Sequence, residues 1–370
     1  DQATGKVTFK PEPGFTGTAN GVTVSVTAPV GRDKDGNVPA NALKTATAKY
    51  TPTVTPITLT PTNKVSEDVQ NVPQTQTPTF ELSNDKTAEI TSKKLVDPAT
   101  GQPTDATTVT VVGEGSYTID PTTGAVTFVP EKDFVGTAKG VTVQATATIK
   151  NEDGKTTTIT ADATYTPTVV PAVPTAQPAK SIDVQGATQK GKPTFEGTTV
   201  TVNGEQKPVT IKENSYTLVD KDGNEVTSTP AYAEDGTTVI GTHTIDPTTG
   251  EVTFTPTDKS YSGKVTPVSV QAESSNGIKV STTYTPEIVP VTPTAENAAT
   301  KDIQGKTQKG KPTFEGGKAT VDGVEKTVEI DEDTPATFED GSTTKTIPGE
   351  GTYTVAPDGT VTFVPEKSFT

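Results

Sequence analysis

The sequence predicts an all-β protein: a tandem array of β-sandwich-like repeat domains of about 115–120 residues, joined by short Pro-rich linkers and elongated overall. Three observations support this fold class. Apolar and polar residues alternate with the period of two that is typical of strands, and no window has a helical period. The predicted strands are short and end at Gly, Asn, Asp or Pro. A long sequence pattern recurs at steps of 115 and 119 residues, which suits independent domains rather than solenoid units.

The best-marked element of the pattern is a β-hairpin over residues 117–128. Tyr117 and Ile119 share one face of its first strand, and Val126 and Phe128 share one face of its second. The turn Asp120–Gly124, DPTTG, has a capping carboxylate, a Pro that presets φ, and a Gly that accepts a positive φ. Copies of the hairpin occur at 241–256 and 351–369, and its second half occurs at 1–15. We interpret this element as structural, because it contains no nucleophile, base or ligand cluster.

Three sequence marks divide the chain. The mark VTF recurs with its phenylalanine at Phe9, Phe128, Phe254 and Phe363. The mark PTF recurs at Phe80, Phe195 and Phe314, and the mark YTP recurs with its tyrosine at Tyr50, Tyr165 and Tyr284. These marks predict the C-terminal part of a repeat at 1–54, complete repeats at 55–170 and 171–290, and the N-terminal part of a repeat at 291–370.

Strands are expected within each division from alternation and turn signals. They cover residues 22–26 and 44–53, then 78–82, 90–96, 107–112, 141–147 and 159–165, with a turn at Glu152-Asp153-Gly154. Asn203-Gly204 and Asp322-Gly323 predict two more hairpins. Lys212–Gly241 is surplus to the pattern and is interpreted as an inserted loop or extra hairpin. Pro-containing stretches, at 55–63 and 171–178, predict extended ties.

Composition excludes several classes of partner. The chain has 31 basic and 46 acidic residues, a net charge of −15, which disfavours nucleic acid and anionic membrane surfaces. Hydrophobic residues make up 29% of the chain, so we expect small cores in several thin domains. The absence of Cys excludes disulfides, and no apolar run has the length of a membrane span, so no membrane insertion is expected.

No catalytic, cofactor-binding or metal residue is predicted, and we expect no enzyme activity and no cofactor. His243 stands where sister repeats have Tyr117 and Tyr353, which favours packing over base catalysis. The loops Asp33–Asn37 and Asp220–Asn224, both DKDGN, resemble calcium loops only faintly, because Gly is fourth rather than sixth and position twelve is Lys44 or Ala231.

A covalent Lys–Asn isopeptide crosslink is a further kind of chemistry to look for in this sequence. It would need a lysine, an asparagine and a buried acid that recur at equivalent strand positions. The closing strands instead supply Lys49, Asp162 and Ser281, which do not form a recurring set. The sequence therefore does not support a crosslink, and bound calcium and crosslinks remain open at this point.

The run Tyr117–Val143, YTIDPTTGAVTFVPEKDFVGTAKGVTV, and ATYTPTV at Ala163–Val169 resemble the CshA-type fibril repeat of streptococcal, Gram-positive surface adhesins. The likeness covers essentially the whole chain and departs at His243 and at Lys264–Pro267, where GTAKG is expected. The resemblance implies a cell-surface fibril protein, extracellular and anchored to the cell wall through a region outside this chain. It implies binding of host matrix, fibronectin included, or of other bacteria through regions outside this chain, with roles in host colonisation and biofilm.

Two hypotheses for function follow. In the first, the chain is a monomeric, extended structural stalk segment that projects an adhesive tip from the cell wall. In the second, the repeats themselves bind host matrix protein, glycan or sister fibrils, with Lys212–Gly241 as the best candidate surface because loops carry function. An enzyme ranks behind both.

Overall fold

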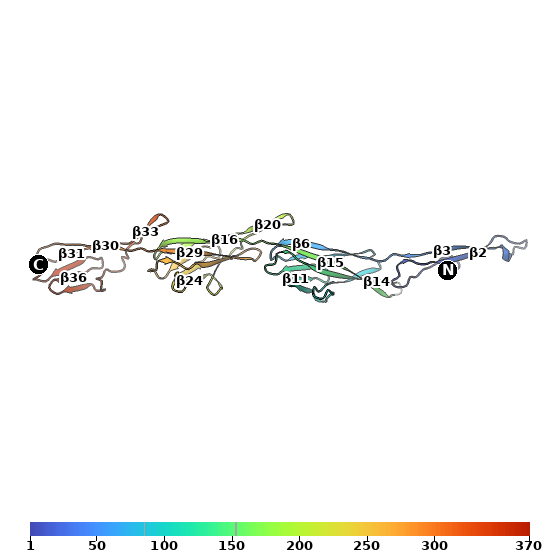
Figure 1. The fold of residues 1–370 in the computed structure, drawn as a ribbon, viewed down its shortest axis with the longest axis horizontal. Helices are drawn as coiled ribbons and strands as arrows, with labels where there is room; N and C mark the ends of the chain where they lie inside the picture. The colour runs from blue at the N-terminus through green and yellow to red at the C-terminus, as the bar shows by residue number, and fades with distance from the viewer. Residues whose placement is uncertain (85, 152–153) are drawn as a thin grey trace. The chain divides into compact units, whose positions relative to one another are not determined.

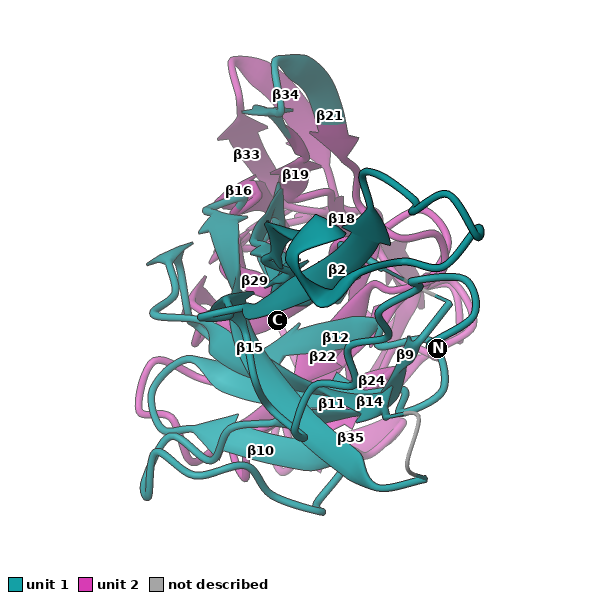
Figure 2. Ribbon diagram, turned by 90° about the vertical axis from the view of Figure 1, so that its right-hand side faces the viewer, with its two compact units in different colours: residues 1–172, 199–207 teal, residues 173–198, 208–370 magenta. Residues whose placement is uncertain are grey.

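The computed structural model describes residues 1–84, 86–151 and 154–370, and it confirms the all-β prediction (Figure 1). Its described elements are β-strands and one short 3-10 helix at Ala40–Ala42. The chain forms two compact units, residues 1–172 with 199–207 and residues 173–198 with 208–370 (Figure 2). In the described part of the chain, no helix has the length and apolar character needed to cross a membrane. The turn expected at Glu152-Asp153-Gly154 rests on two residues outside the described ranges.

Unit 1 contains a β-sandwich between residues 64 and 170. One sheet has the order β10-β11-β12-β7, with bounds Thr108–Val111, Gly115–Ile119, Val126–Pro130 and Gln74–Gln76. The other has the order β13-β15-β14-β9, with β6 also on β15, and bounds Gly136–Thr137, Thr156–Val170, Val141–Lys150, Ala88–Leu95 and Lys64–Val69. Tyr117 from the first sheet and Val143 and Tyr165 from the second share one core. The predicted strands of this repeat are therefore confirmed.

The predicted central hairpin is β11–β12. Tyr117 lies opposite Phe128 in its register, and Ile119 lies opposite Val126. The Asp120 carboxylate accepts the Thr122 N–H at 2.8 Å, and Gly124 has φ of 79°, so the turn has the conformation expected from its sequence. Four alternating side chains thereby reach the core from the twelve residues 117–128.

The first and last strands of this repeat pair in parallel, which local sequence patterns did not predict. β6 lies along the final six residues of β15, from the Lys64–Tyr165 pair to the Val69–Val170 pair. The stretch expected to be an extended tie is partly a strand as well, because β5, Leu59–Thr62, pairs with β8, Thr79–Leu82. Pro61 lies inside β5, an edge position where a missing N–H is tolerated.

Unit 2 repeats this sandwich between residues 179 and 289. One sheet has the order β18-β26-β25-β24, with bounds Gln189–Gly191, Val252–Pro256, Val239–Ile245 and Ser228–Tyr232. The other has the order β17-β29-β28-β22-β23, with β27 also on β29, and bounds Ala179–Val184, Lys279–Val289, Val268–Glu273, Thr217–Val219, Glu225–Val226 and Gly263–Lys264. β17 again pairs in parallel with the last six residues of β29.

The stretch Lys212–Gly241 is not a separate inserted loop. β22 pairs with β28 as β9 pairs with β14, and β24 pairs with β25 as β10 pairs with β11, so both are strands of the sandwich. The part without a counterpart in unit 1 is the short β22–β23 hairpin. Of the two interpretations, the inserted loop was wrong, because Leu218, at 0% exposure, and Ala231 are core residues, and the extra hairpin is right only for β22–β23.

Residues 291–370 of unit 2 form a sheet of order β31-β37-β36-β35, with bounds Gln308–Gly310, Val361–Pro365, Gly351–Val355 and Thr344–Ile347. A short antiparallel pair precedes this sheet, formed by β30, Thr294–Glu296, and β32, Thr313–Glu315. The preceding repeat has the matching pair, formed by β16, Thr175–Gln177, and β19, Thr194–Glu196.

Both predicted two-residue hairpins are confirmed. They are β20–β21, Thr198–Val202 with Glu205–Val209, and β33–β34, Lys318–Val321 with Val324–Thr327. Asn203 and Gly204 have φ of 50° and 82°, and Asp322 and Gly323 have φ of 51° and 77°. Two consecutive positive φ values are the signature of a type I′ turn, which Asn-Gly and Asp-Gly favour.

Residues 1–54 form two antiparallel pairs, β1–β4 and β2–β3, with bounds Gly17–Thr18, Thr53–Val54, Val22–Pro29 and Leu43–Tyr50. Their apolar side chains lack the cover that the sandwiches provide. Val22 is 55% exposed and Val26 is 61% exposed, whereas Val141, at the place of Val22 in the unit 1 sandwich, is 4% exposed.

We expect the backbone amides of β2–β3 to exchange with solvent much faster than those of β14–β15. Few buried apolar contacts oppose local opening of the β2–β3 pair. Hydrogen exchange of the full chain, read by mass spectrometry with correction for intrinsic rates, measures both pairs in one sample. Equal protection of the two pairs would contradict this account of where the stable cores lie.

Candidate functional site

A buried polar cluster lies where the first and last strands of each sandwich meet. In unit 1 the Ser66 and Tyr165 hydroxyls are 2.7 Å apart, and Ser66 also donates to the Gln74 Oε1. The Gln74 Nε2 then donates to the Thr168 carbonyl at 2.9 Å. Tyr165 is 0% exposed, and burial raises the pKa of its phenol. We call this set of residues, Ser66, Gln74, Tyr165 and Thr168, the seam cluster.

Unit 2 contains the same cluster at equivalent positions. The Ser181 hydroxyl lies 2.6 Å from the Tyr284 hydroxyl and donates to the Gln189 Oε1 at 2.7 Å. The Gln189 Nε2 donates to the Glu287 carbonyl at 2.9 Å. These groups satisfy one another's hydrogen bonds inside the protein, and burial raises the pKa of Tyr284 as well. A protonated phenol, a hydroxyl and an amide link the strands through hydrogen bonds, and they do not form an acid–base pair.

Sequence reasoning quoted the tyrosines of this cluster as marks but missed their partners. A signal was available, because Ser66 and Gln74 are eight residues apart, as are Ser181 and Gln189. Thr300 and Gln308 hydrogen-bond across the same spacing at 2.7 Å.

His243 packs in the core of unit 2. It lies on β25 opposite Phe254, as Tyr117 lies opposite Phe128, and it is 1% exposed. Its ring centroid is 5.4 Å from that of Phe254 and 5.9 Å from that of Tyr284. Burial lowers the pKa of the imidazole to about 4, and neither ring nitrogen has a hydrogen-bond partner among the described residues. A general base needs an orienting partner, so the geometry supports the packing role.

Both DKDGN loops are turns whose first carboxylate is occupied by backbone N–H groups. Asp33 Oδ1 accepts from Asp35 at 3.0 Å and Asn37 at 2.8 Å. Asp220 Oδ1 accepts from Asp222 at 2.9 Å and Asn224 at 2.8 Å, and the Asn224 N–H bond is the largest cause that lowers the pKa of Asp220. Within the described ranges, no group of three or more His, Cys, Asp or Glu side chains is placed to hold a metal.

The residues considered for an isopeptide crosslink are exposed on strands. Asp162 lies opposite Gln144 and Ser281 lies opposite Gln271 at equivalent places, whereas Lys49 is displaced by two residues. The Gln144 amide donates to Asp162 at 3.0 Å. The structure brings no lysine, asparagine and buried acid together from this set.

The second strand of each type I′ hairpin carries a lysine that forms an ion pair with an aspartate on the first strand of a sandwich. Within unit 1, Lys207 lies 2.5 Å from Asp68, and the Asn203 N–H donates to Glu67 at 2.6 Å. Within unit 2, Lys326 lies 2.6 Å from Asp183. Asp68 and Asp183 also accept the N–H of the next residue at 2.7 Å, so both carboxylates are held in the same way.

A polar cavity of about 220 Å³ lies beside the β22–β23 hairpin in unit 2. Lys212 pairs with Glu273 at 3.2 Å, and Lys279 pairs with Glu225, so these four charges compensate one another, and Glu213 adds a further negative charge to the lining. Its lining also includes Asn214, which accepts from Thr248. Of the stretch Lys212–Gly241, the residues that line this cavity are Lys212, Glu213, Asn214, Ser215, Thr217 and Glu225.

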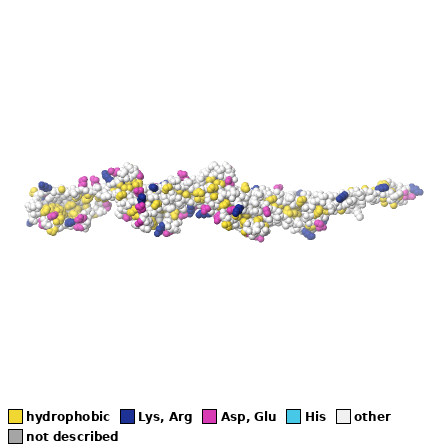
Figure 3. Space-filling view, viewed as in Figure 1, with side chains coloured by type: hydrophobic (Ala, Val, Ile, Leu, Met, Phe, Trp, Pro, Cys, Tyr) yellow, Lys and Arg dark blue, Asp and Glu magenta, His cyan; other side chains and the backbone are white. Residues whose placement is uncertain are grey.

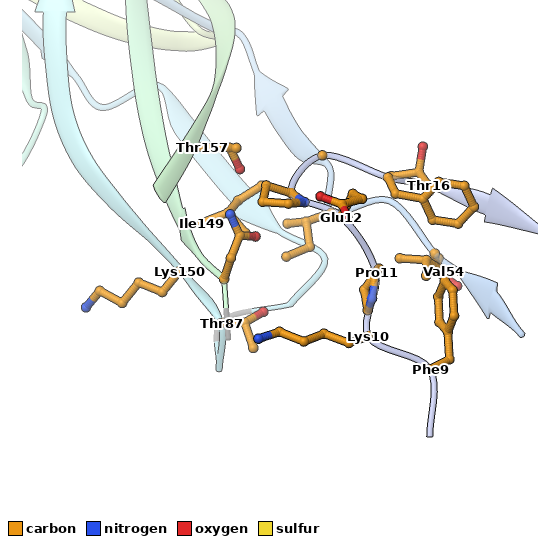
Figure 4. Close-up of a pocket in the computed structure, with 16 residues that line it drawn as sticks. Phe9, Lys10, Pro11, Glu12, Thr16, Val54, Thr87, Ile149, Lys150 and Thr157 are labelled. Carbon is orange, nitrogen blue, oxygen red and sulfur yellow. The ribbon is translucent and has the colours of Figure 1, made fainter. Parts of the chain in front are cut away.

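Two further cavities have mixed linings. One, of about 330 Å³ in unit 1, lies between Phe9 and Val54 on one side and Ile149 and Thr157 on the other (Figure 4). Another, of about 610 Å³ in unit 2, lies beside β17 and β29 and includes Asp322 of the β33–β34 turn. Figure 3 shows acidic and basic side chains interspersed along the visible face.

The fold, the duplicated seam cluster and the duplicated hairpins all indicate one repeated unit. The family model for the surface adhesin CshA repetitive domain matches residues 56–169, 171–288 and 290–370. The chain belongs to the CshA repeat family. It is therefore a repeat region of the kind found in surface adhesins, a non-enzymatic kind of domain, and the family indicates an extracellular location.

Other comparisons add little to the CshA repeat assignment. No curated protein matches the chain. Among solved structures, protocadherin gamma B2 domains 3–6 is 11% identical, with 74% of this chain and 59% of that chain covered and a TM-score of 0.23. Mouse cadherin-23 EC22-24 is 13% identical, with 84% and 89% covered and a TM-score of 0.25. The fibronectin(III)-like modules of Clostridium thermocellum CbhA are 12% identical, with 63% and 94% covered and a TM-score of 0.19. These low scores contribute nothing to the functional argument.

Proposed function

We propose that this chain is a structural stalk segment of a cell-surface fibrillar adhesin, in which CshA repeats follow one another and project an adhesive tip from the cell wall. The division into 1–54, 55–170, 171–290 and 291–370 is part of this proposal. So are the wall anchor and the contacts with host matrix such as fibronectin or with other bacteria, which we assign to regions outside the chain.

The parallel pairing of first and last strands is the observation that supports this role most strongly. The chain begins the sandwich at Lys64, at one end of the strand pair, and leaves it at Val170, at the other end. The six paired residues span five rises of about 3.3 Å, which separates these points by roughly 17 Å along the strands. Because the chain enters the repeat at one end and leaves it at the other, each repeat carries the chain forward along the stalk. Antiparallel first and last strands would bring the chain back to the end at which it entered.

Small-angle scattering of the full chain tests the stalk. We expect a maximum dimension well beyond that of a compact globule of the same mass, and the same dimension at low and high protein concentration, because the chain is proposed to be monomeric. A maximum dimension no larger than a globule would refute the proposal.

The alternative function is direct binding by the repeats, at the polar cavity lined by Lys212, Glu225 and Glu273. Immobilised chain can be exposed to matrix proteins and to salivary glycoproteins. Retention that is lost in Glu225→Ala but kept in Glu251→Ala, another glutamate of unit 2 that pairs with a lysine, would favour binding at this cavity. Retention of no ligand would contradict direct binding of these partners by the repeats and would leave the stalk proposal standing.

A further inference from the structure

We propose that the parallel pair of first and last strands, fastened by the seam cluster, is a mechanical clamp that makes each CshA repeat resist being pulled apart from its ends. The inference deepens the stalk proposal and rests on it for its biological use. Its physical basis is the direction of the strands in the described sandwiches.

Tension along the chain acts on the two strands in opposite directions. Force toward the N-terminus pulls β6 from its Lys64 end, and force toward the C-terminus pulls β15 from its Val170 end. Because the strands run the same way, these forces slide one strand along the other. All six pairs from Lys64–Tyr165 to Val69–Val170 then carry the load together, and none can be broken alone.

Side chains and flanking bonds add to the same seam. The Ser66–Tyr165 contact and the Gln74–Thr168 bond both cross between residues near the first strand and residues of the last. The Asn63 side chain accepts the Thr164 N–H at 2.8 Å at one end of the ladder, and the Gln70 N–H donates to the Val170 carbonyl at 2.8 Å at the other. Sliding by one residue would break these bonds at the same moment as the ladder.

The arrangement recurs in unit 2. Six parallel pairs run from Ala179–Tyr284 to Val184–Val289, and Ser181 and Gln189 reproduce the fastening. Beyond the ladder, the Gln185 N–H donates to the Val289 carbonyl and the Gln185 side chain accepts the Val291 N–H. Recurrence of the ladder and cluster in a second sandwich indicates that the clamp is a property of the repeat.

Single-molecule pulling in two directions tests the clamp. The chain has no Cys, so handles can be attached only where a cysteine is introduced. In the full chain, the pair Thr62→Cys with Pro171→Cys loads β6 and β15 from opposite ends and shears the ladder. The pair Pro73→Cys with Pro171→Cys loads both strands from the same end and opens the ladder one residue pair at a time. All three positions are exposed.

We expect the unfolding force to be severalfold higher for the shearing pair of handles than for the peeling pair. Forced unfolding reports the unfolding barrier, so the comparison is made at one loading rate on the same folded repeat. Equal forces for the two pairs would overturn the clamp. That result would leave the stalk proposal standing, whereas a compact scattering envelope would remove the stalk and leave the clamp measurable.

The role of the seam cluster is tested by two matched substitutions in the shearing geometry. Tyr165→Phe removes the hydroxyl that contacts Ser66 and keeps the ring. Tyr117→Phe makes the same change at an equally buried tyrosine on β11, whose ring packs against Tyr165 but whose hydroxyl makes no hydrogen bond to the seam cluster. We expect Tyr165→Phe alone to lower the shearing force. Equal effects of the two variants would overturn the assignment of the cluster to the clamp. Urea unfolding of both variants separates a mechanical change from a change in equilibrium stability.

Discussion

Acidification should destabilise the repeat at 171–288 through His243, with a loss of stability of up to about 3 kcal/mol between pH 6.5 and pH 4. Burial lowers the pKa of this imidazole from 6.5 to about 4 in the folded protein. The unfolded chain therefore binds a proton near pH 6.5, and the folded repeat binds it only near pH 4. The contribution of the neutral His243 imidazole to the stability of the repeat is therefore complete above pH 6.5 and is lost progressively as the pH falls toward 4.

Substitutions in both sandwiches isolate this effect from that of the carboxylates. His243→Phe removes the titrating group and keeps an aromatic ring beside Phe254, so it should flatten the pH dependence of the 171–288 repeat. Tyr117→His places an imidazole at the matching position in unit 1 and should make that repeat acid-sensitive. Urea unfolding of the full chain at pH 7, 5.5 and 4.5, followed by hydrogen exchange of peptides from each repeat, measures both. An unchanged pH dependence in His243→Phe would show that the imidazole is not the cause.

Substitution of Gly115 by alanine should cost about 3 kcal/mol, because it adds both strain and a steric clash. Gly115 has φ of 150°, and a Cβ there would lie 2.2 Å from the Val129 carbonyl oxygen and 2.9 Å from the Phe128 ring. The same close approach recurs at Gly351, where the oxygen of Val364 would be 2.3 Å away. The glycine at the start of this hairpin lets the facing phenylalanine ring lie against the backbone.

Two other glycines, Gly113 beside Gly115 and Gly241 at the matching position in unit 2, separate the backbone strain from the steric clash. Gly113 has φ of 79° but open space around its missing Cβ, so Gly113→Ala should cost only about 1 kcal/mol for the left-handed backbone. Gly241 has no positive φ, yet a Cβ would lie 2.5 Å from the Thr255 oxygen, so Gly241→Ala reports the clash alone. Urea unfolding of each variant in the full chain gives the three values. A loss in Gly115→Ala no larger than in Gly113→Ala would mean that the hairpin adjusts at little cost.

Local chemistry explains why the hairpins could be predicted from the sequence. The turns at Asp120–Gly124, Asn203-Gly204 and Asp322-Gly323 depend on residues within a few positions of one another, and their conformations are those expected. The core position of His243 could also be predicted, because the matching residues of the other repeats, Tyr117 and Tyr353, are aromatic and a core position accepts either kind of ring. The DKDGN loops became turns for the same local reason.

The eight-residue spacing of the serine and glutamine was visible in the sequence, but their contact with the tyrosine of the last strand could not be predicted, because it joins residues that are distant in sequence. Ser66 and Tyr165 are 99 residues apart, and Ser181 and Tyr284 are 103 apart. Nothing in the alternation of a strand shows whether its partner runs parallel or antiparallel. The stretch Lys212–Gly241 was misjudged for a related reason, since counting surplus residues does not show which of them pair with β28 and β25.

Parallel closure also sets the order of events during synthesis of the chain. Residues 64–69 cannot complete the ladder until residues 165–170 have been made. At about 5–20 residues per second, each repeat waits roughly 5–20 s with its core open. During that interval β6 lacks the strand with which it pairs, and the buried ring of Tyr165 is absent from the core. Faithful assembly therefore depends on each final strand closing its own repeat before the following copy of that strand emerges.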